Sequence, residues 1–202
     1  ASYLVEHELL DEVACDMLDS LRGRLASEKL VLAFVAEFSR GKSELINAIF
    51  FADAGRRVLP ATPGRTTMCP VELGYDAEEP PSLALLPIET RLDSLSLSEL
   101  RAQPRAWTLR ELAVDAPEEL ARALAEVTRT QRVSVDRARE LGFWDDEKPQ
   151  DNPPIEGGLV EVPVWRHALI NYPHPLLKRG LVVLDTPGLN AIGAEPELTL
   201  SL

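Results

Sequence analysis

The fold is decided by residues 30–50, which read LVLAFVAEFSRGKSELINAIF. The first seven residues are apolar and uncharged, residues 37–43 form a polar turn that ends in Gly-Lys-Ser, and apolar residues then recur at helical spacing. This order predicts a buried strand, a tight loop and a helix, which is the layout of a phosphate-binding loop. The unpaired N–H groups and the dipole at the start of such a helix favour a polyphosphate there.

Two side chains of this loop have roles that the pattern itself predicts. Lys42 would reach the β- and γ-phosphates of a nucleotide, and the hydroxyl of Ser43 would bind Mg²⁺. Ala36 stands where the pattern has its first glycine, so its Cβ would narrow the mouth of the loop. The alternative is a Gly-Lys-Ser that occurs by chance in an ordinary turn between a strand and a helix.

A second apolar strand ends in a carboxylate near the other end of the chain. Residues 180–184 read GLVVL and run into Asp185-Thr186-Pro187-Gly188. A carboxylate at the tip of a strand, followed by glycine three residues on, places Asp185 to hold Mg²⁺ and leaves the amide of Gly188 for the γ-phosphate. Because both motifs follow an apolar strand, they support each other as parts of one α/β nucleotide fold.

The segment between the two motifs begins with a loop. Residues 55–70 are rich in proline and glycine, and they lead into a short predicted strand at 71–75. In nucleotide switches such a loop carries a threonine that closes on Mg²⁺ and the γ-phosphate in the triphosphate state. Thr66 and Thr67 are both available for that role. The alternative is a surface loop whose threonines have no function.

The composition excludes several classes of function. The 202 residues include 33 acidic and 21 basic ones, a formal net charge of −12, which disfavours nucleic acid and anionic lipid as partners of most of the surface. No apolar run reaches the roughly 18 to 20 residues that span a bilayer, and the first residues lack the layout of a secretion signal. We therefore expect a cytoplasmic protein that binds no nucleic acid.

The three segments together resemble the first three nucleotide motifs of the dynamin superfamily of large GTPases, specifically of its bacterial members. The resemblance covers residues 36–48, 59–70 and 185–190. It implies GTP and Mg²⁺ as cofactors, and it makes Thr67 rather than Thr66 the switch threonine. By the same resemblance the catalytic residues are Ser39 and Thr67, the metal ligands are Ser43, Thr67 and Asp185, and the nucleotide-binding residues are Glu37, Phe38, Ser39, Arg40, Gly41, Lys42, Ser43, Asp185 and Gly188.

The expected fold class is α/β, a three-layer P-loop G-domain with a mixed, mostly parallel sheet and a large helical insertion. We expect an N-terminal helix over residues 1–28, packed on the core or on a helical bundle. A partial dynamin-type GTPase domain is expected over 29–202, with the insertion at about 76–158. No Asn/Thr-Lys-x-Asp run, which reads guanine in GTPases, follows Asp185, so the domain is expected to be incomplete at its carboxyl end.

Local patterns predict the elements of the insertion and of the strand after it. Residues 108–111 form a capping-box pattern for a short helix, and a longer helix is predicted over 117–141, with arginines on its surface. That surface is expected to be solvated or, alternatively, to meet a partner. Residues 160–165 alternate as a strand, which a short connection at 174–175 would pair antiparallel with the strand that ends at Asp185.

The resemblance implies binding and hydrolysis of GTP, with a nucleotide-dependent change that is coupled to self-association through the GTPase domain and to membrane remodelling. Membrane contact is expected only through regions outside this chain, which would make the full-length protein peripheral. Two alternatives stay open. One is an ATPase or a nucleotide-binding module with little turnover, since nothing before residue 202 selects the base. The other is a structural domain with a degenerate loop.

Overall fold

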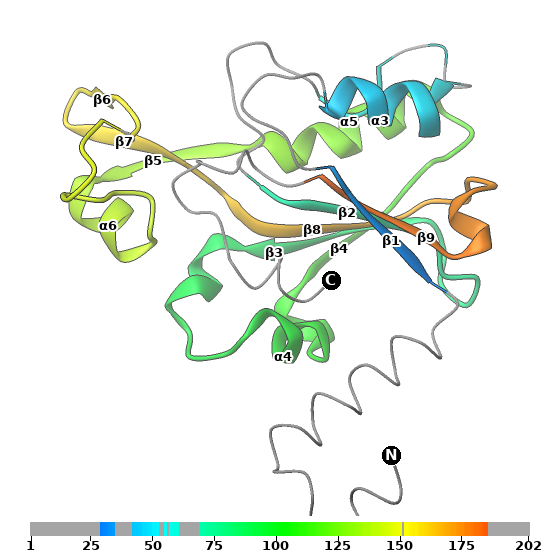
Figure 1. Ribbon diagram of the computed structural model, residues 1–202, viewed down its shortest axis with the longest axis horizontal. Coiled ribbons are helices and arrows are strands. Elements are labelled where there is room, and N and C mark those ends of the chain that lie inside the picture. Colours follow the sequence, from blue (N-terminus) through cyan, green and yellow to red (C-terminus); the bar gives the residue numbers. More distant parts are fainter. Residues whose placement is uncertain are drawn as a thin grey trace, which may run out of the picture. The chain divides into compact units, whose positions relative to one another are not determined.

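The computed structural model describes residues 29–34, 42–52, 55, 57–60, 69–150 and 152–185, with only the backbone of Phe34 and Lys42 (Figure 1). The chain divides into two compact units, residues 1–30 and 31–202, and the described structure lies almost wholly in the second. The helix expected over residues 1–28 lies outside the described residues.

The main sheet has six strands in the order β1-β9-β2-β8-β3-β4. Strand β2 pairs in parallel with β8 and antiparallel with β9, whereas β3 pairs antiparallel with both β8 and β4. The sheet is therefore mixed, as expected, but the expectation of a mostly parallel sheet is wrong for these strands. The bounds are β1 (Leu30–Phe34), β2 (Val71–Gly74), β3 (Ser82–Pro87), β4 (Thr108–Glu111), β8 (Trp165–Asn171) and β9 (Leu181–Asp185).

Helices lie on both faces of this sheet. Figure 1 shows α3 (Lys42–Phe50) and α5 (Pro117–Leu124) over one face and α4 (Leu97–Arg101) at the other. The helices α3 and α5 share one buried core with strands β2, β3 and β8, to which they contribute Ile46, Phe50, Leu120 and Leu124. A smaller cluster joins Leu97 and Leu100 of α4 to Leu86 of β3. Burial of these apolar side chains is what holds the layers together.

A second sheet of three strands, in the order β5-β7-β6, forms with one helix a separate lobe over residues 130–163. Figure 1 shows β7 running on into β8, so the lobe is an extension of a central strand of the main sheet. Its own apolar cluster includes Ala138, Leu141, Phe143, Val160 and Val162. The lobe consists of β5 (Thr130–Ser134), α6 (Val135–Glu140), β6 (Ile155–Glu156) and β7 (Leu159–Pro163).

The expectation of a large helical insertion is wrong, because a strand interrupts the predicted long helix. Helix α5 ends at Leu124, a 3₁₀ turn covers Ala125–Thr128, and β5 then pairs antiparallel with β7, with Thr130 opposite Pro163. Two β-branched side chains, Thr130 and Val133, favour this extended conformation, and the ladder to β7 supplies backbone partners that a local pattern does not reveal. Other 3₁₀ turns among the described residues are η2 (Ile88–Leu92), η3 (Pro104–Ala106) and η5 (Leu177–Arg179).

The capping-box pattern at residues 108–111 does not start a helix either. These residues form β4, which pairs antiparallel with β3, with Glu111 opposite Ser82. A capping box is present earlier in the chain, where Ser96 and Glu99 exchange side-chain and backbone hydrogen bonds at the start of α4. The spacing of a hydroxyl residue and a glutamate is the same at both sites, but residues 108–111 pair with β3 instead of forming a helix.

The pairing expected for the strand that ends at Asp185 is also different. Strand β9 pairs with β2, which lies between β9 and β8 in the sheet. The connection between β8 and β9, which passes through η5, therefore crosses over one strand instead of forming a hairpin. The position of β2 between β9 and β8 depends on pairing between residues far apart in the chain. It brings the start of β2 next to Asp185, in the candidate site described next.

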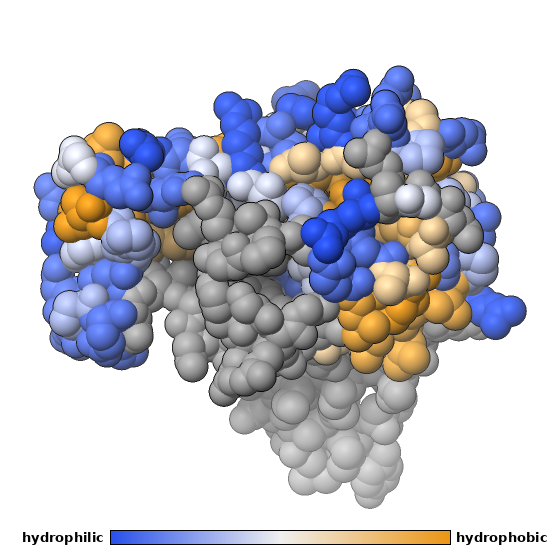
Figure 2. Space-filling view, turned by 90° about the horizontal axis from the view of Figure 1, so that it is seen from above, coloured by the Kyte–Doolittle hydropathy of each residue, from blue (hydrophilic) through white to orange (hydrophobic). Residues whose placement is uncertain are grey.

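The surface is mostly hydrophilic where Figure 2 shows it, with apolar residues gathered on one part of that face. Exposed apolar side chains include Leu45 and Ile49 of α3 and Val31 and Leu32 of β1. In the part of the chain that the structure describes, no helix combines the length and apolar character needed to cross a membrane.

Candidate nucleotide-binding site

The site is built around the start of α3. The helix begins at Lys42, as the loop pattern predicts, and Glu44 in its first turn suits the positive end of the helix dipole. Ile46 and Phe50, four residues apart, are almost fully buried and fix the inner face of the helix on the sheet. This packing leaves Ser43 half-buried in the first turn of the helix.

The two sequence motifs meet through a direct hydrogen bond. Ser43 Oγ donates to Asp185 Oδ2 over 2.8 Å, although the two residues are 142 positions apart in the chain. Asp185 is the last residue of β9 and is only 4% exposed. A carboxylate that is taken out of water needs a polar or charged partner. The bond therefore marks a polar centre between the start of a helix and the end of a strand.

The strand that follows the segment with Thr66 and Thr67 is paired with the strand that ends at Asp185. Val71, the first residue of β2, is paired with Asp185 on the neighbouring strand. The proline- and glycine-rich loop that carries Thr66 and Thr67 ends directly before this strand, where Cys69 and Pro70 are buried. Residues 43, 71 and 185 thus converge from three separate parts of the chain.

The chemistry of this pair fits Mg²⁺. Magnesium takes hard oxygen ligands and is commonly held by one or two carboxylates, with nucleotide phosphates and water completing its shell. Ser43 and Asp185 supply one hydroxyl and one carboxylate. Within the described ranges, no group of three or more His, Cys, Asp or Glu side chains could hold a metal.

Several predicted site residues lie outside the described residues, so the structure does not test them. Lys42 is placed by its backbone alone, as the first residue of α3. Ser43 and Asp185 are the predicted residues whose side chains the structure brings together. The untested residues are Glu37, Phe38, Ser39, Arg40, Gly41, Thr67 and Gly188.

Sequence reasoning gave no role to Asn47, which lies one helical turn after Ser43. The residue is 8% exposed, and its side chain hydrogen-bonds both to Ser43 and to the backbone at residues 58–59. The signal available in the sequence was a single amide within the otherwise apolar run of residues 45–50. A buried amide at such a position implies specific partners.

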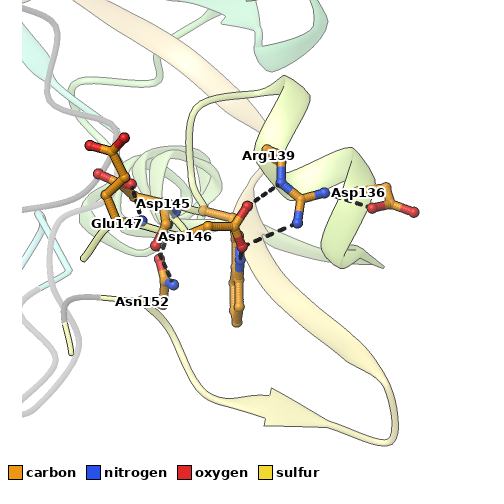
Figure 3. A network of polar contacts seen from close by, with 7 residues as sticks. Asp136, Arg139, Asp145, Asp146, Glu147 and Asn152 are labelled. Atoms are coloured by element: carbon orange, nitrogen blue, oxygen red, sulfur yellow. Dashed lines mark hydrogen bonds and ion pairs between the residues drawn. The ribbon is translucent and has the colours of Figure 1, made fainter. Parts of the chain in front are cut away.

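The arginines expected on a long helix are mostly paired within the lobe and its approach. Arg139 contacts Asp136 at 2.6 Å and Asp146 at 2.8 Å, and the indole of Trp144 also donates to Asp146 (Figure 3). The hydrogen bond from Arg139, assisted by that from Trp144, lowers the pKa of the Asp146 carboxyl. Further pairs join Arg129 to Glu126, Arg132 to Glu156 and Arg137 to Glu140. This pairing favours a solvated, locally neutralised surface over an arginine surface for a partner.

A polar network also closes the loop after α6. The backbone N–H of Asp145 donates to the side chain of Asn152, whose amide returns a hydrogen bond to the carbonyl of Asp145, each over 2.8 Å (Figure 3). The backbone N–H of Glu147 donates to the Asp145 carboxylate. These contacts stabilise the loop itself and reach no residue of the nucleotide site.

A mixed α/β sheet with a polar centre of this kind is what a nucleotide-binding G-domain has at its phosphate end. A sequence model of the dynamin family matches residues 32–201, and the chain therefore belongs to the dynamin family, of which it carries the GTPase domain. No curated protein matches the chain.

The solved structures that are similar to this chain include two of an oligomerised bacterial dynamin pair, which is described as providing a mechanism for the long-range sensing and tethering of membranes. The first is 15% identical, with a TM-score of 0.39, and the match covers 93% of this chain and 28% of that one. The second is 15% identical, with a TM-score of 0.36, and the match covers 92% and 26%. The chain thus spans little more than a quarter of the length of these structures.

Proposed function

We propose that this chain binds GTP together with Mg²⁺ and hydrolyses it, as the GTPase domain of a dynamin-like protein. The observation that supports this most directly is the 2.8 Å hydrogen bond between Ser43 of the phosphate-binding loop and Asp185 of the second motif. Two motifs that are far apart in the sequence and share one expected ligand are adjacent in space. A Gly-Lys-Ser that occurs by chance would not be expected to lie next to Asp185.

The residues of the loop have distinct roles in this proposal. Glu37, Phe38, Ser39, Arg40 and Gly41 line the phosphates, with backbone N–H groups facing the anion. Lys42 neutralises the β- and γ-phosphates, and Gly188 offers its amide to the γ-phosphate. Ser39 and Thr67 act on the reacting phosphate and on the attacking water. Phosphoryl transfer depends mainly on how these groups are positioned, and less on the reactivity of any one of them.

Ser43, Thr67 and Asp185 would hold the metal. When bound, Mg²⁺ supplies charge that offsets the developing negative charge on the phosphates. The hydroxyl of Ser43 and the carboxylate of Asp185 already share one hydrogen bond, so little rearrangement is needed for both oxygens to face a common ion.

Binding of the triphosphate is proposed to change the conformation of the chain and to promote self-association through this domain. The solved structures that resemble the chain belong to an oligomerised bacterial dynamin pair that is described as tethering membranes. Membrane contact by the full-length protein, which would then be cytoplasmic and peripheral, would come from regions outside this chain.

The proposal is tested by titrating fluorescent GTP, GDP and ATP into the full-length protein, with and without Mg²⁺. We expect Mg²⁺-dependent binding with a preference for guanine nucleotides, and hydrolysis of GTP. Equal affinity for ATP and GTP would favour the alternative of an ATPase or a general nucleotide module. Absence of binding by any nucleotide would favour a structural domain with a degenerate loop.

A first prediction concerns Lys42. Replacing it in Lys42→Ala removes a charge-assisted contact of about 1.5–3 kcal/mol, and the affinity for GTP should fall roughly ten- to a hundredfold. The matched control is Lys148→Ala, an exposed lysine of the lobe, which should leave the affinity unchanged. Both are measured by the same fluorescence titration. Equal affinities in the two variants would rule out the phosphate-loop interpretation.

A further inference from the structure

We propose that Asn47 is a positioning residue of the nucleotide site, which holds residues 58–59 in a fixed place relative to Ser43. This inference rests on the proposed function and extends it to a residue that makes no contact with phosphate in that proposal. The amide of Asn47 lies on α3, one turn after Ser43, and only 8% of the residue is exposed.

All the hydrogen-bonding capacity of this side chain is used on two segments. Its oxygen accepts from the backbone N–H of Val58 at 3.0 Å and of Leu59 at 2.7 Å. Its nitrogen donates to the carbonyl of Leu59 at 2.8 Å and to the carbonyl of Ser43 at 2.9 Å. An asparagine amide offers two donor hydrogens and two acceptor lone pairs, so this set is complete. A buried group with every bond satisfied is a specific clamp.

Hydrophobic packing also holds residues 58–59 in place. Val58 and Leu59 are 2% and 3% exposed and belong to the main core. A second link, the ion pair between Glu44 and Arg57, joins the same two segments, but its side chains are 46% and 54% exposed. An exposed ion pair contributes little. The buried amide of Asn47 is therefore the stronger of the two connections.

These contacts place the described residues on either side of 61–68 relative to the same centre. Before that segment, Leu59 is held by Asn47, which also bonds to Ser43. After it, Val71 is paired with Asp185, to which Ser43 donates its hydroxyl hydrogen. The described residues that flank the segment with Thr67 are thus tied, before and after it, to the Ser43–Asp185 pair. Loss of the Asn47 contacts would loosen the chain at residues 58–59, before that segment.

The expected consequence is a loss of triphosphate discrimination. Thr67 is proposed to act only on the γ-phosphate state, so a misplaced start of its segment should weaken GTP binding more than GDP binding. We expect Asn47→Ala in the full-length protein to lower the ratio of GTP to GDP affinity, measured with Mg²⁺, by roughly tenfold. Asn47→Asp keeps the acceptor for Val58 and Leu59 but sets a carboxylate against two carbonyls, and it should lower the same ratio at least fivefold.

The matched control is Asn171→Ala. The Asn171 side chain also bonds only to backbone groups, at Asp76, Glu79 and Pro80, and it lies at the end of β2 and β8 away from Asp185. It should lower the melting temperature without changing the nucleotide ratio. An unchanged ratio in folded Asn47→Ala, or an equal change in Asn171→Ala, would overturn the inference.

Two further measurements test the inference even if Asn47→Ala does not fold. If Asn47→Ala does not fold, Asn47→Asp is judged by the same ratio. Hydrogen exchange on the unaltered protein without nucleotide should show slow exchange of the Val58 and Leu59 amides, and fast exchange at both would overturn the clamp. Failure of the unaltered protein to bind GTP would overturn the proposed function and this role together. Loss of binding in Lys42→Ala, with no effect of Asn47→Ala, would overturn this role alone.

Discussion

Glu72 is a charged residue on β2 that the main sheet holds mostly away from water. Arg101, at the end of α4, contacts both oxygens of its carboxylate, and His167 Nε2 of β8 lies 3.9 Å from Glu72 Oε2. Burial raises the pKa of the carboxyl, but the nearby imidazole of His167 and the hydrogen bonds from Arg101 lower it more, and the pKa of Glu72 falls from 4.5 to about 2. The ionised form is therefore preferred in the folded state.

This residue predicts an acid-dependent loss of stability. Because the folded pKa lies below the unfolded one, the contribution of Glu72 is complete above about pH 4.5 and is lost as the pH falls toward 2. The difference in free energy of unfolding between wild type and Glu72→Gln should shrink by about 2 kcal/mol from pH 6 to pH 3. Urea unfolding at both pH values measures this difference. A difference that stays constant over that interval would contradict the assignment.

Substitutions at Thr66 and Thr67 test which of these two residues is the switch threonine. In the proposed function Thr67 responds to the γ-phosphate, so Thr67→Ala should leave GDP affinity unchanged and weaken GTP affinity by roughly tenfold. Thr66→Ala is the matched control and should change neither. Paired titrations of both nucleotides give the answer, and the opposite result would move the switch threonine by one residue.

The hairpin between β6 and β7 shows how one short element fixes the register of the lobe. Gly157 and Gly158 have φ values of 61° and 80°, and Glu156 is paired with Leu159 across this two-residue turn. Positive φ at both central positions is the requirement of a type I′ turn, whose twist matches that of the flanking strands. The turn therefore selects glycine for its backbone conformation.

A substitution in this turn separates conformation from packing. A Cβ added at Gly157 would meet nothing within 4 Å, so Gly157→Ala should cost only the strain of positive φ, about 1 kcal/mol. Gly157→Asn should cost less, because asparagine tolerates this region better. Gly74→Ala is the control, with no positive φ and an ordinary 3.8 Å contact to Val182 Cγ2. Chemical unfolding measures all three, and equal losses for alanine and asparagine would refute the turn argument.

At the scale of the whole described fold, the lobe is joined to the main sheet through η2. The backbone N–H of Ile88 donates to the carbonyl of Val164 at 2.9 Å, and the Ile88 side chain is buried in the cluster of the lobe. Arg91 donates to the carbonyl of Leu141 at 2.7 Å and lies over the ring of Phe143, 4.7 Å from its centroid. This 3₁₀ turn thus holds the lobe at a second point besides the β7–β8 strand.

Removal of the contacts made by η2 should lower the local stability of the lobe without changing that of the main sheet. Arg91→Ala takes away a hydrogen bond and a cation–π contact, which together stabilise by about 1–3 kcal/mol. We expect faster hydrogen exchange in β5 and β7 and unchanged exchange in β2 and β3. Arg132→Ala is the control, since it breaks an ion pair whose side chains are 60% and 68% exposed. Equal protection of the lobe in both variants would show that η2 does not hold it.

The sequence by itself determined the class of fold and the positions of two motifs. Local spacing is enough to place Ser43 at the start of a helix and Asp185 at the end of a strand, because both signals lie within a few neighbouring residues. Tertiary structure decided which strands meet. It inserted β2 between β8 and β9, turned residues 130–134 into a strand, and gave Asn47 its partners at residues 58–59. These outcomes depend on hydrogen bonds and burial between residues far apart in the chain, which no local pattern encodes.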